Sequence, residues 1–377
     1  MLIDRRSRVC ELINKMNLRG AIFCSPSSIR YLSGYVAPVE IGPNPLEAGP
    51  PILLINKDGE TGIIVSEFEE QPARSSSKVD HVSTYSCYNI HDVSMKAIDN
   101  LTGVLLDLMK RLKIDEGALG IEAEHFPTAL LWRLQENLRA LSWRDVSRNL
   151  ETLRAVKDED EIQLIRHVCE VTSWGQITAR QLVSEGVSEI EIYSLVKAKI
   201  EEKAGARTPL LADMISGERT WEVSGHPSTR RLRRGDLVIC DLVPRIDGYW
   251  GDSCSTISVG GASEEHRRLH RIVMTALQKG IESVRPGVSA MELDKIVRGE
   301  IRRHGYDYPH HTGHGLGVTY HEEPRIYPSS NTQLKPGMVL ALEPGVYING
   351  IGGIRLEVII LVTEDGGEVL TKYSKEL

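Results

Sequence analysis

Apolar and polar positions in the first 150 residues alternate between two patterns, one helical and one typical of short strands. Residues 5–18 carry apolar positions at helical spacing, and the apolar run 20–25 follows them directly. Two further apolar runs within residues 49–69 are separated by Asp58 and Gly59, which predicts two strands joined by a tight turn. The alternation continues with a helical pattern at 104–114 and an apolar run at 117–124. Helices alternating with strands predict an α/β domain for this part of the chain.

The pattern changes near residue 150, where a long helical segment begins. Apolar positions keep helical spacing over residues 151–183, and Asp158 or Glu159 is expected to place a carboxylate in the first turn of a helix. We therefore predict an N-terminal α/β domain at residues 1–150 and a second domain at residues 151–377.

The second half of the chain contains an internal repeat. Residues 186–200 match residues 287–301 at Gly, Val, Ser, Glu, Val and Ile positions, an offset of 101 residues from 186 to 287. Residues 232–241 match residues 334–343, an offset of 102 residues from 232 to 334. Two copies are too few for a solenoid, but two segments of different type that share nearly one offset indicate a duplicated helix and strand. We therefore predict one α+β domain with pseudo-twofold symmetry.

Each copy of the repeat ends its strand on an acid, Asp241 in the first and Glu343 in the second. A turn and a second strand follow in each copy and lead to another acid, Asp252 or Glu357. The turns fall midway between the two acids, so the acids of each pair are expected to lie roughly opposite each other across a hairpin. The pseudo-twofold symmetry would then bring all four carboxylates to one cavity.

Four carboxylates in one cavity repel one another unless cations compensate them. Two divalent ions bridged by water would neutralise them and supply a hydrolytic nucleophile, and mostly oxygen ligands suit Mn²⁺, Co²⁺, Fe²⁺ or Zn²⁺. Residues 310–324, HHTGHGLGVTYHEEP, hold four histidines that could complete such a site. From this stretch alone, metal ligands, catalytic groups and polar loop residues are all open interpretations.

Composition and charge are those of a globular protein and do not indicate binding to nucleic acid or an anionic membrane. The formal net charge is −7, and 26% of the residues are charged. The cluster Arg230, Arg231, Arg233 and Arg234 precedes an apolar run, which favours a turn before a strand over an anion-binding patch. Six cysteines without a CxxC pair favour reduced thiols and a cytoplasmic protein. No apolar run approaches the roughly 18 to 20 residues of a transmembrane helix.

The candidate ligands also resemble those of a known family. Five residues, in chain order, are similar to the five-ligand dinuclear centre of the pita-bread metallopeptidases: Asp241, Asp252, His314, Glu343 and Glu357. The preceding α/β domain, together with IRYLSGY at residues 29–35 and LRAVKDEDEI at residues 153–162, resembles the branch that contains aminopeptidase P, prolidase and creatinase. The resemblance covers essentially the whole chain.

The resemblance implies a role for each matching residue. The five ligands would hold two divalent ions, with Mn²⁺ expected first and Co²⁺, Fe²⁺ or Zn²⁺ as the other candidates. Glu343 would also move a proton during catalysis. His321 would contact the substrate near the scissile bond, and His310 would aid substrate binding. Tyr347 and Arg355 match residues that support the site, and Arg355 can hold a carboxylate by two hydrogen bonds.

The chain departs from the family pattern around the expected substrate pocket. Relatives that act on Xaa-Pro bonds usually have a histidine at the position of Ser224, whereas here the nearest histidine is His226. Val243 stands where a glycine is usual. Cys254 is also a departure, and the expected role for it is packing as a small buried residue. The pattern assigns no role to His311.

The expected activity is hydrolysis of an amide bond in a small peptide, as an Xaa-Pro dipeptidase or an Xaa-Pro aminopeptidase. Two other functions are open. One is a creatinase-like hydrolase that cleaves a non-peptide C–N bond in a small modified amino acid. The other is a catalytically inactive pita-bread module that binds a partner. The expected partners are a small peptide or amide substrate and a second copy of the chain, because the resemblance implies a homodimer.

Overall fold

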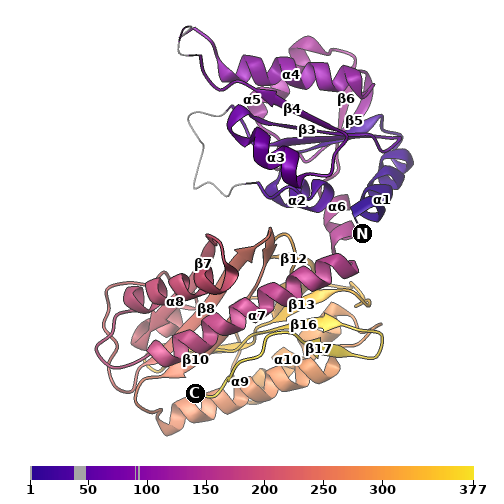
Figure 1. The fold of residues 1–377 in the computed structure, drawn as a ribbon. Coiled ribbons are helices and arrows are strands. Elements are labelled where there is room, and N and C mark those ends of the chain that lie inside the picture. The colour runs from indigo at the N-terminus through magenta and orange to yellow at the C-terminus, as the bar shows by residue number, and fades with distance from the viewer. Residues whose placement is uncertain (1, 38–47, 90, 92–93) are drawn as a thin grey trace. The chain divides into compact units, whose positions relative to one another are not determined.

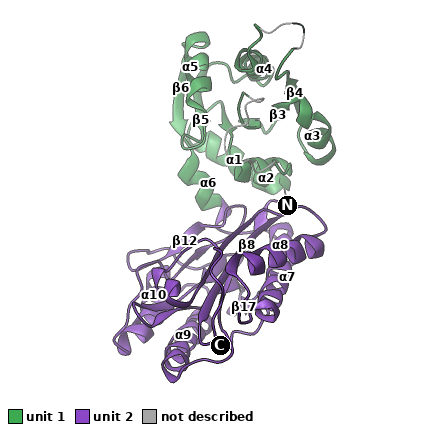
Figure 2. Cartoon of the chain, turned by 90° about the vertical axis from the view of Figure 1, so that its left-hand side faces the viewer, with its two compact units in different colours: residues 1–153 green, residues 154–377 purple. Residues whose placement is uncertain are grey.

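The computed structural model describes residues 2–37, 48–89, 91 and 94–377. The chain divides into two compact units, residues 1–153 and residues 154–377 (Figure 2). Each unit has its own sheets and its own apolar core.

Unit 1 is built on a mixed six-stranded sheet in the order β4-β3-β2-β1-β5-β6. The strands are β1 (Gly20–Phe23), β2 (Ile52–Asn56), β3 (Thr61–Ser66), β4 (His81–Tyr85), β5 (Gly117–Ile121) and β6 (Leu141–Asp145). The predicted strand pair around Asp58 and Gly59 is confirmed, because β2 and β3 are antiparallel neighbours. The strand β1 is parallel to β5 and antiparallel to β2. This mixture of helices and sheet is the expected α/β architecture.

The helices of unit 1 are α1 (Leu2–Lys15), α2 (Pro26–Ser33), α3 (Glu70–Ser76), α4 (Ala97–Arg111), α5 (Thr128–Asn137) and α6 (Ser147–Arg154), with a 3₁₀ turn η1 (Glu67–Glu69). The helix α4 buries Leu101, Leu105 and Leu108 in one apolar cluster with residues of the sheet. Their spacing of three and four residues places them on one helical face, which explains why this segment is a helix packed on the sheet.

Unit 2 contains two larger sheets and a two-stranded hairpin (Figure 1). The first sheet has the order β10-β8-β7, with β9 paired to β8, and the second has the order β12-β11-β13-β16-β17. The strands of the first are β7 (Leu210–Ser216), β8 (Leu237–Ile246), β9 (Tyr249–Trp250) and β10 (Ser253–Ser258). Those of the second are β11 (Gly313–Gly315), β12 (Glu322–Ile326), β13 (Val339–Leu342), β16 (Val358–Val362) and β17 (Gly367–Val369). The hairpin is β14 (Gly345–Ile348) with β15 (Gly352–Arg355).

The helices of unit 2 form two pairs, and the strands lie between these pairs in Figure 2. The helices are α7 (Glu159–Leu182), α8 (Glu189–Ala204), α9 (Glu264–Ser283) and α10 (Ala290–Arg303), and a 3₁₀ segment η2 spans Gly217–Glu222. The helices α7 and α8 pack together and contact the sheet with β8, and the helices α9 and α10 pack together beside the other sheet. The core of the second half joins α9 and α10 to β13 and β16.

The internal repeat is visible in this arrangement. Ser188 begins α8 by accepting a hydrogen bond from the backbone of Glu191, and Ser289 begins α10 in the same way. Each serine also forms an isolated β-bridge to a matching segment, Ser188 to Arg231 ahead of β8 and Ser289 to Gln333 ahead of β13. Asp241 lies within β8, whereas Glu343 directly follows β13. The predicted duplication of a helix and a strand is therefore confirmed.

The single helix expected over residues 151–183 is wrong at its start. The chain leaves α6 after Arg154 and begins α7 only at Glu159, because Val156 forms a β-bridge with Met338. Asp158 then starts α7 with a capping box, in which its side chain accepts from the backbone of Glu161. Between α6 and α7, the backbone pairs with a segment about 180 residues further along the chain, at Gly337 and Met338. The local spacing of apolar residues cannot predict such a contact.

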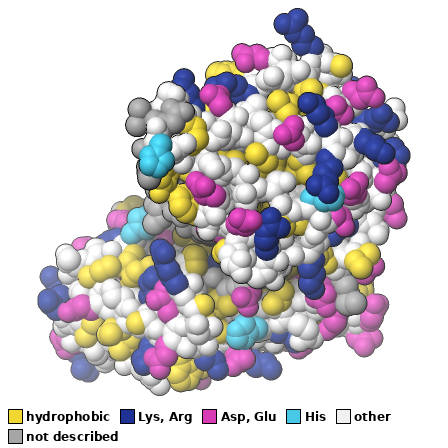
Figure 3. Space-filling model, turned by 45° about the horizontal axis from the view of Figure 1, so that its top comes forward, with side chains coloured by type: hydrophobic (Ala, Val, Ile, Leu, Met, Phe, Trp, Pro, Cys, Tyr) yellow, Lys and Arg dark blue, Asp and Glu magenta, His cyan; other side chains and the backbone are white. Residues whose placement is uncertain are grey.

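The surface carries charges of both signs, and Lys and Arg side chains lie among Asp and Glu side chains over the face in Figure 3. The arginine cluster that begins at Arg230 lies just before β8, as expected for a turn, and Arg230 pairs with Asp236 at 2.6 Å. None of the helices in the described part of the chain combines the length and the apolar character needed to cross a bilayer.

Candidate metal centre

The first pair of acids lies on the hairpin of β8 and β10. Asp247 and Gly248, both with positive φ, form the tight turn, and this turn pairs Asp241 with Cys254 across the strands. Asp252 therefore lies two residues away from the position directly opposite Asp241, just before β10 begins. The two acids are expected to lie roughly opposite each other, and in the structure they belong to one hairpin with an offset of two residues.

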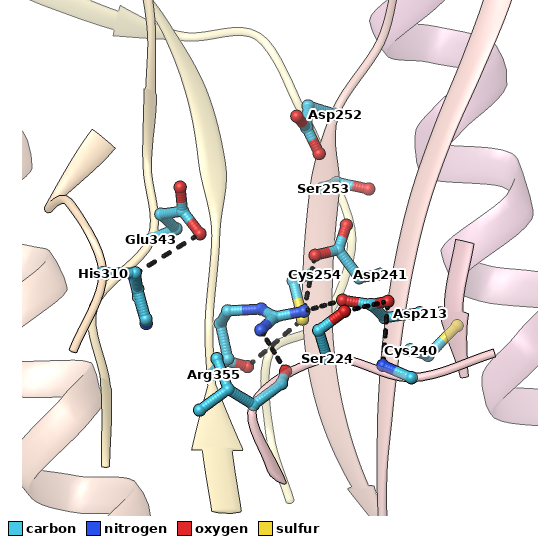
Figure 4. A network of polar contacts seen from close by, with 12 residues as sticks. Asp213, Ser224, Cys240, Asp241, Asp252, Ser253, Cys254, His310, Glu343 and Arg355 are labelled. Atoms are coloured by element: carbon cyan, nitrogen blue, oxygen red, sulfur yellow. Dashed lines mark hydrogen bonds and ion pairs between the residues drawn. The ribbon is translucent and has the colours of Figure 1, made fainter. Parts of the chain in front are cut away.

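The second pair of acids flanks the hairpin of β14 and β15. Gly345 pairs with Arg355, so Glu343 and Glu357 lie two residues beyond this last pair on opposite strands. Glu357 is buried, and its backbone N–H donates to the carbonyl oxygen of Cys254 at 2.9 Å. This bond joins the second hairpin to the first. Figure 4 shows Glu343 across from Asp241 and Asp252.

His314 completes the cluster from the short strand β11. Its Nδ1 donates to the carbonyl of Gly315 at 2.9 Å, which leaves the lone pair of Nε2 available to the site. That nitrogen lies 3.6 Å from Oδ2 of Asp252 and 3.6 Å from Oε1 of Glu343. Gly313 is required beside it, because a Cβ there would lie 2.0 Å from the carbonyl oxygen of Ala341 on β13. The GHG sequence thus lets the strands approach closely enough to bury the imidazole.

Burial makes three carboxyls of the site, those of Asp241, Asp252 and Glu357, resist ionisation. It raises the pKa of Asp241 to about 7, and the positive charge of Arg355 offsets only part of this effect. Burial, together with the nearby charge of Asp241, also holds the pKa values of Asp252 and Glu357 well above the usual range. These carboxyls need positive charge close by if they are to be ionised at neutral pH.

Glu343, His314 and His321 instead have lowered pKa values. Burial opposes ionisation of Glu343, but a hydrogen bond from His311 and the nearby His314 outweigh it and lower the pKa of this carboxyl to about 2. Burial and the neighbouring His321 lower the pKa of His314 to about 3, and burial and His311 lower that of His321 to about 4. The imidazoles of His314 and His321 are therefore neutral at pH 7, which is the form that binds metal.

Two buried carboxylate oxygens show that the residues of the site fit cations. Among the residues that the structure describes, neither Oδ1 of Asp241 nor Oε2 of Glu357 has a hydrogen-bond partner. Leaving a buried acceptor without a partner costs about 1 to 3 kcal/mol, and more if it is charged. Asp252, His314 and Glu357 each bring one ligand atom within 4.8 Å of the others. Buried carboxylates with unpaired oxygens and one neutral imidazole fit divalent cations.

Three further histidines surround Glu343. His310 donates from Nδ1 to the carbonyl of His311 at 2.8 Å and accepts from the hydroxyl of Tyr347 at 2.9 Å. Nε2 of His311 lies 2.8 Å from Oε1 of Glu343, a contact that sequence analysis did not predict. The ring of His321 is centred 4.0 Å from that of His314. The histidine stretch therefore contributes one buried ligand candidate and three half-buried groups beside it.

Arg355 joins the acids to a residue that sequence analysis missed. Its Nη2 donates to Oδ2 of Asp241 at 2.7 Å and to Oδ2 of Asp213 at 3.0 Å (Figure 4). Asp213 pairs with Asp241 across β7 and β8, so both side chains lie on one face of the sheet. The available signal was that Asp213 is the one charged residue in the mostly apolar strand of residues 210–216.

A cavity of about 780 Å³ opens over these residues. It is lined by all five candidate ligands and by His310, His321 and Arg355. Ser224, His226 and Val243 also line it, so two of the three departures from the family pattern face the substrate space. Cys254 is fully buried behind Arg355, whose carbonyl oxygen lies 3.7 Å from its sulfur, and the expected packing role of this cysteine agrees with that position.

Known proteins similar to this chain match it along nearly its whole length and include metal-dependent peptidases. Residues 163–364 match metallopeptidase family M24, and residues 5–156 match the creatinase/prolidase N-terminal domain. The chain is 31% identical over 377 residues to the Xaa-Pro dipeptidase of Pyrococcus horikoshii, which covers 99% of this chain and 98% of the relative. The crystal structure of the prolidase from Pyrococcus horikoshii OT3 is similar with a TM-score of 0.85 at 30% identity, and 99% of each chain is covered.

A second solved structure, the Xaa-Pro dipeptidase from Bacillus anthracis, has a TM-score of 0.85 at 26% identity and covers 100% of this chain and 99% of its own. The predicted family, the pita-bread fold and the assignment as a hydrolase are confirmed by these matches. Family membership also implies divalent metal ions, in agreement with the unpaired carboxylate oxygens. The chain is a member of metallopeptidase family M24 with a creatinase/prolidase N-terminal domain.

Proposed function

We propose that this chain is a dinuclear metal-dependent peptidase that cleaves the Xaa-Pro bond of small peptides, as a dipeptidase or an aminopeptidase. The observation that carries the proposal is the convergence of four acids and one histidine in a single cavity. The full-length similarity to proteins named Xaa-Pro dipeptidase and prolidase supports the choice of bond. We further propose that the chain acts in the cytoplasm and forms a homodimer. Sedimentation of the purified protein tests the homodimer.

The residues that would hold two divalent ions are Asp241, Asp252, His314, Glu343 and Glu357. Mn²⁺ is the first candidate, and Co²⁺, Fe²⁺ or Zn²⁺ are the others. When bound, such ions polarise an amide carbonyl and lower the pKa of water.

The side chains around this centre would handle the substrate and the proton. Glu343 lies among His310, His311 and His314, so it can take a proton from the attacking water and return it to the leaving nitrogen. His321 would donate to the carbonyl oxygen as it gains charge, and His310, held by Tyr347, would contact the substrate. Arg355 would keep the Asp241 carboxylate oriented.

One alternative function has a specific observation in its favour. Ser224 and Val243, which replace the usual histidine and glycine, both line the cavity, so its substrate can differ from that of the named relatives. A creatinase-like hydrolase acting on a C–N bond of a small modified amino acid fits this change. An inactive binding module is a weaker alternative, because all five ligand positions are retained.

A combined metal and substrate experiment tests these functions. Protein purified without added metal is expected to contain a transition metal by elemental analysis. After loading with Mn²⁺ it should hydrolyse Xaa-Pro dipeptides or longer Xaa-Pro peptides in preference to other dipeptides and to guanidino or cyclic amides. Activity that survives exhaustive chelation would favour the creatinase-like alternative. Absence of metal and of hydrolysis after Mn²⁺ or Co²⁺ addition would favour the binding module.

Replacement of His321 by alanine is expected to lower kcat about a hundredfold, the usual effect of losing one donor to a developing oxyanion. Metal content should stay near that of the wild type, because His321 is not among the proposed ligands. Exposed His304→Ala is the control and should change neither quantity. Loss of metal from the His321→Ala protein would show that the division of the histidines is wrong.

A further inference from the structure

One wall of the cavity contains a strained turn. Val223 has φ 74° and ψ −53°, a region that residues with branched side chains rarely adopt. The backbone N–H of Ser224 donates to the carbonyl of Glu222 at 2.9 Å, which closes a three-residue turn of the rare γ type. Such a conformation persists only where the surrounding structure holds it in place.

The turn is held by Asp213 and Arg355 (Figure 4). Oδ1 of Asp213 accepts from the hydroxyl of Ser224 at 3.0 Å and from the backbone N–H of Gly225 at 3.1 Å. Nη1 of Arg355 donates to the carbonyl of Val223 at 2.7 Å. Val223, Ser224 and Gly225 are therefore hydrogen-bonded to one carboxylate and one guanidinium. These two groups are in turn hydrogen-bonded to each other at 3.0 Å. The backbone of Gly225 gains one more bond from the N–H of Met214 at 3.2 Å.

The same guanidinium connects the turn to the metal centre. Arg355 is buried, and besides Asp213 its Nη2 holds Oδ2 of Asp241 at 2.7 Å. Val223 and Ser224 line the cavity together with Asp213. Arg355 therefore bridges this wall and the carboxylate of Asp241 by hydrogen bonds, and Asp213 contacts both Arg355 and the turn.

We propose that Asp213 is a positioning residue for the substrate: it holds the strained turn at residues 222–225 and so places the cavity wall of Val223 and Ser224 relative to Asp241. The inference rests on the proposed peptidase function, because the wall is taken to face the peptide. This role differs from one in which Asp213 only balances the charge of Arg355. Balancing the charge requires a carboxylate near Arg355, whereas holding the turn requires that Oδ1 of residue 213 accepts hydrogen bonds from Ser224 and Gly225.

Two variants separate these roles. Asp213→Ala removes both contacts, and it is expected to raise KM for an Xaa-Pro dipeptide about tenfold, with kcat within about twofold and metal content unchanged. Asp213→Asn keeps an acceptor for Ser224 and Gly225, so KM should stay within about threefold of the wild type. The matched control is Asp107→Ala, which changes an exposed aspartate in unit 1 and should leave KM unchanged. Equal defects in the alanine and asparagine variants would overturn the proposal, as would loss of metal with an unchanged KM.

The strain itself supplies an independent test. Glycine adopts positive φ without cost, so Asp213→Ala should raise KM less in a Val223→Gly background than in the wild type. Hydrogen exchange measured by mass spectrometry should show residues 222–226 exchanging at least about tenfold faster in Asp213→Ala. This readout does not need activity, so failure of the proposed function appears as absent hydrolysis by the wild type while the exchange result still stands. Unchanged exchange in this segment would overturn the positioning role.

Discussion

Replacing Glu343 with glutamine is expected to lower kcat for an Xaa-Pro peptide by about a thousandfold. Glutamine has nearly the same shape, but it can neither take up the proton of the attacking water nor carry the negative charge that helps to hold a cation. The carboxylate is in the ionised form that both tasks need, because its pKa is held at about 2, and His311 donates to it at 2.8 Å. Turnover measured with saturating Mn²⁺ and metal content measured by elemental analysis report the two effects separately.

The matched control is Glu364→Gln, which makes the same chemical change at an exposed glutamate in the same unit. It should retain wild-type turnover and metal content. The Glu343 variant should bind metal more weakly, so both variants are compared at a metal concentration that saturates each. Turnover within tenfold of the wild type under these conditions would contradict the proton-transfer role of Glu343.

The duplicated strand explains why the acids of the site were predictable. Asp241 and Glu343 occupy matching places in the repeat, and each begins a hairpin whose second strand leads to another acid. The symmetry therefore indicated convergence without any knowledge of the packing. The register was less predictable: the turn falls at Asp247 and Gly248, about one residue after the midpoint of the two acids, so Asp241 pairs with Cys254 instead of Asp252.

The contacts that sequence analysis missed all depend on lateral packing. Asp213 becomes part of the site because β7 lies beside β8 in a register that pairs it with Asp241. His311 meets Glu343 because β11 pairs with β13, and the backbone of Glu343 donates to the carbonyl of Thr312. A pattern of apolar positions predicts which face of a strand is buried, but it does not predict which strand is the neighbour or in which register.

The break between α6 and α7 is another product of long-range packing, and it creates a buried ionic cluster. Lys157, in this break, places Nζ 3.1 Å from Oε2 of Glu322, and Nε of Arg154 lies 3.6 Å from Oε1 of the same carboxylate. Glu322 also accepts from the backbone N–H of Thr319 at 3.1 Å. The side chains of Lys157 and Glu322 are at most 1% exposed. Glu322 directly follows His321, so the cluster anchors the chain beside a proposed substrate contact.

Glu322→Gln is therefore expected to destabilise the protein by about 3 kcal/mol, because it leaves the charges of Lys157 and Arg154 buried without their anion. The loss should depend on pH. Burial opposes ionisation of Glu322, but Lys157 and Arg154 outweigh it, and the pKa of this carboxyl is lowered from 4.5. A lowered folded-state pKa gives stability that is present above the unfolded pKa and disappears as pH falls through the folded one. The difference between wild type and Glu322→Gln should thus be largest near pH 7 and shrink below about pH 4.5.

Urea unfolding at a series of pH values measures this difference, with exposed Glu364→Gln as the control for loss of a carboxylate. The control should unfold like the wild type at every pH. A destabilisation of Glu322→Gln that is the same at pH 3 as at pH 7 would mean that the shape of the side chain matters and its charge does not. If the free energy of unfolding falls with pH in the wild type and the Glu364 control but less in Glu322→Gln, the difference belongs to the ion pairs of Glu322 with Lys157 and Arg154. No other carboxylate differs between the wild type and Glu322→Gln.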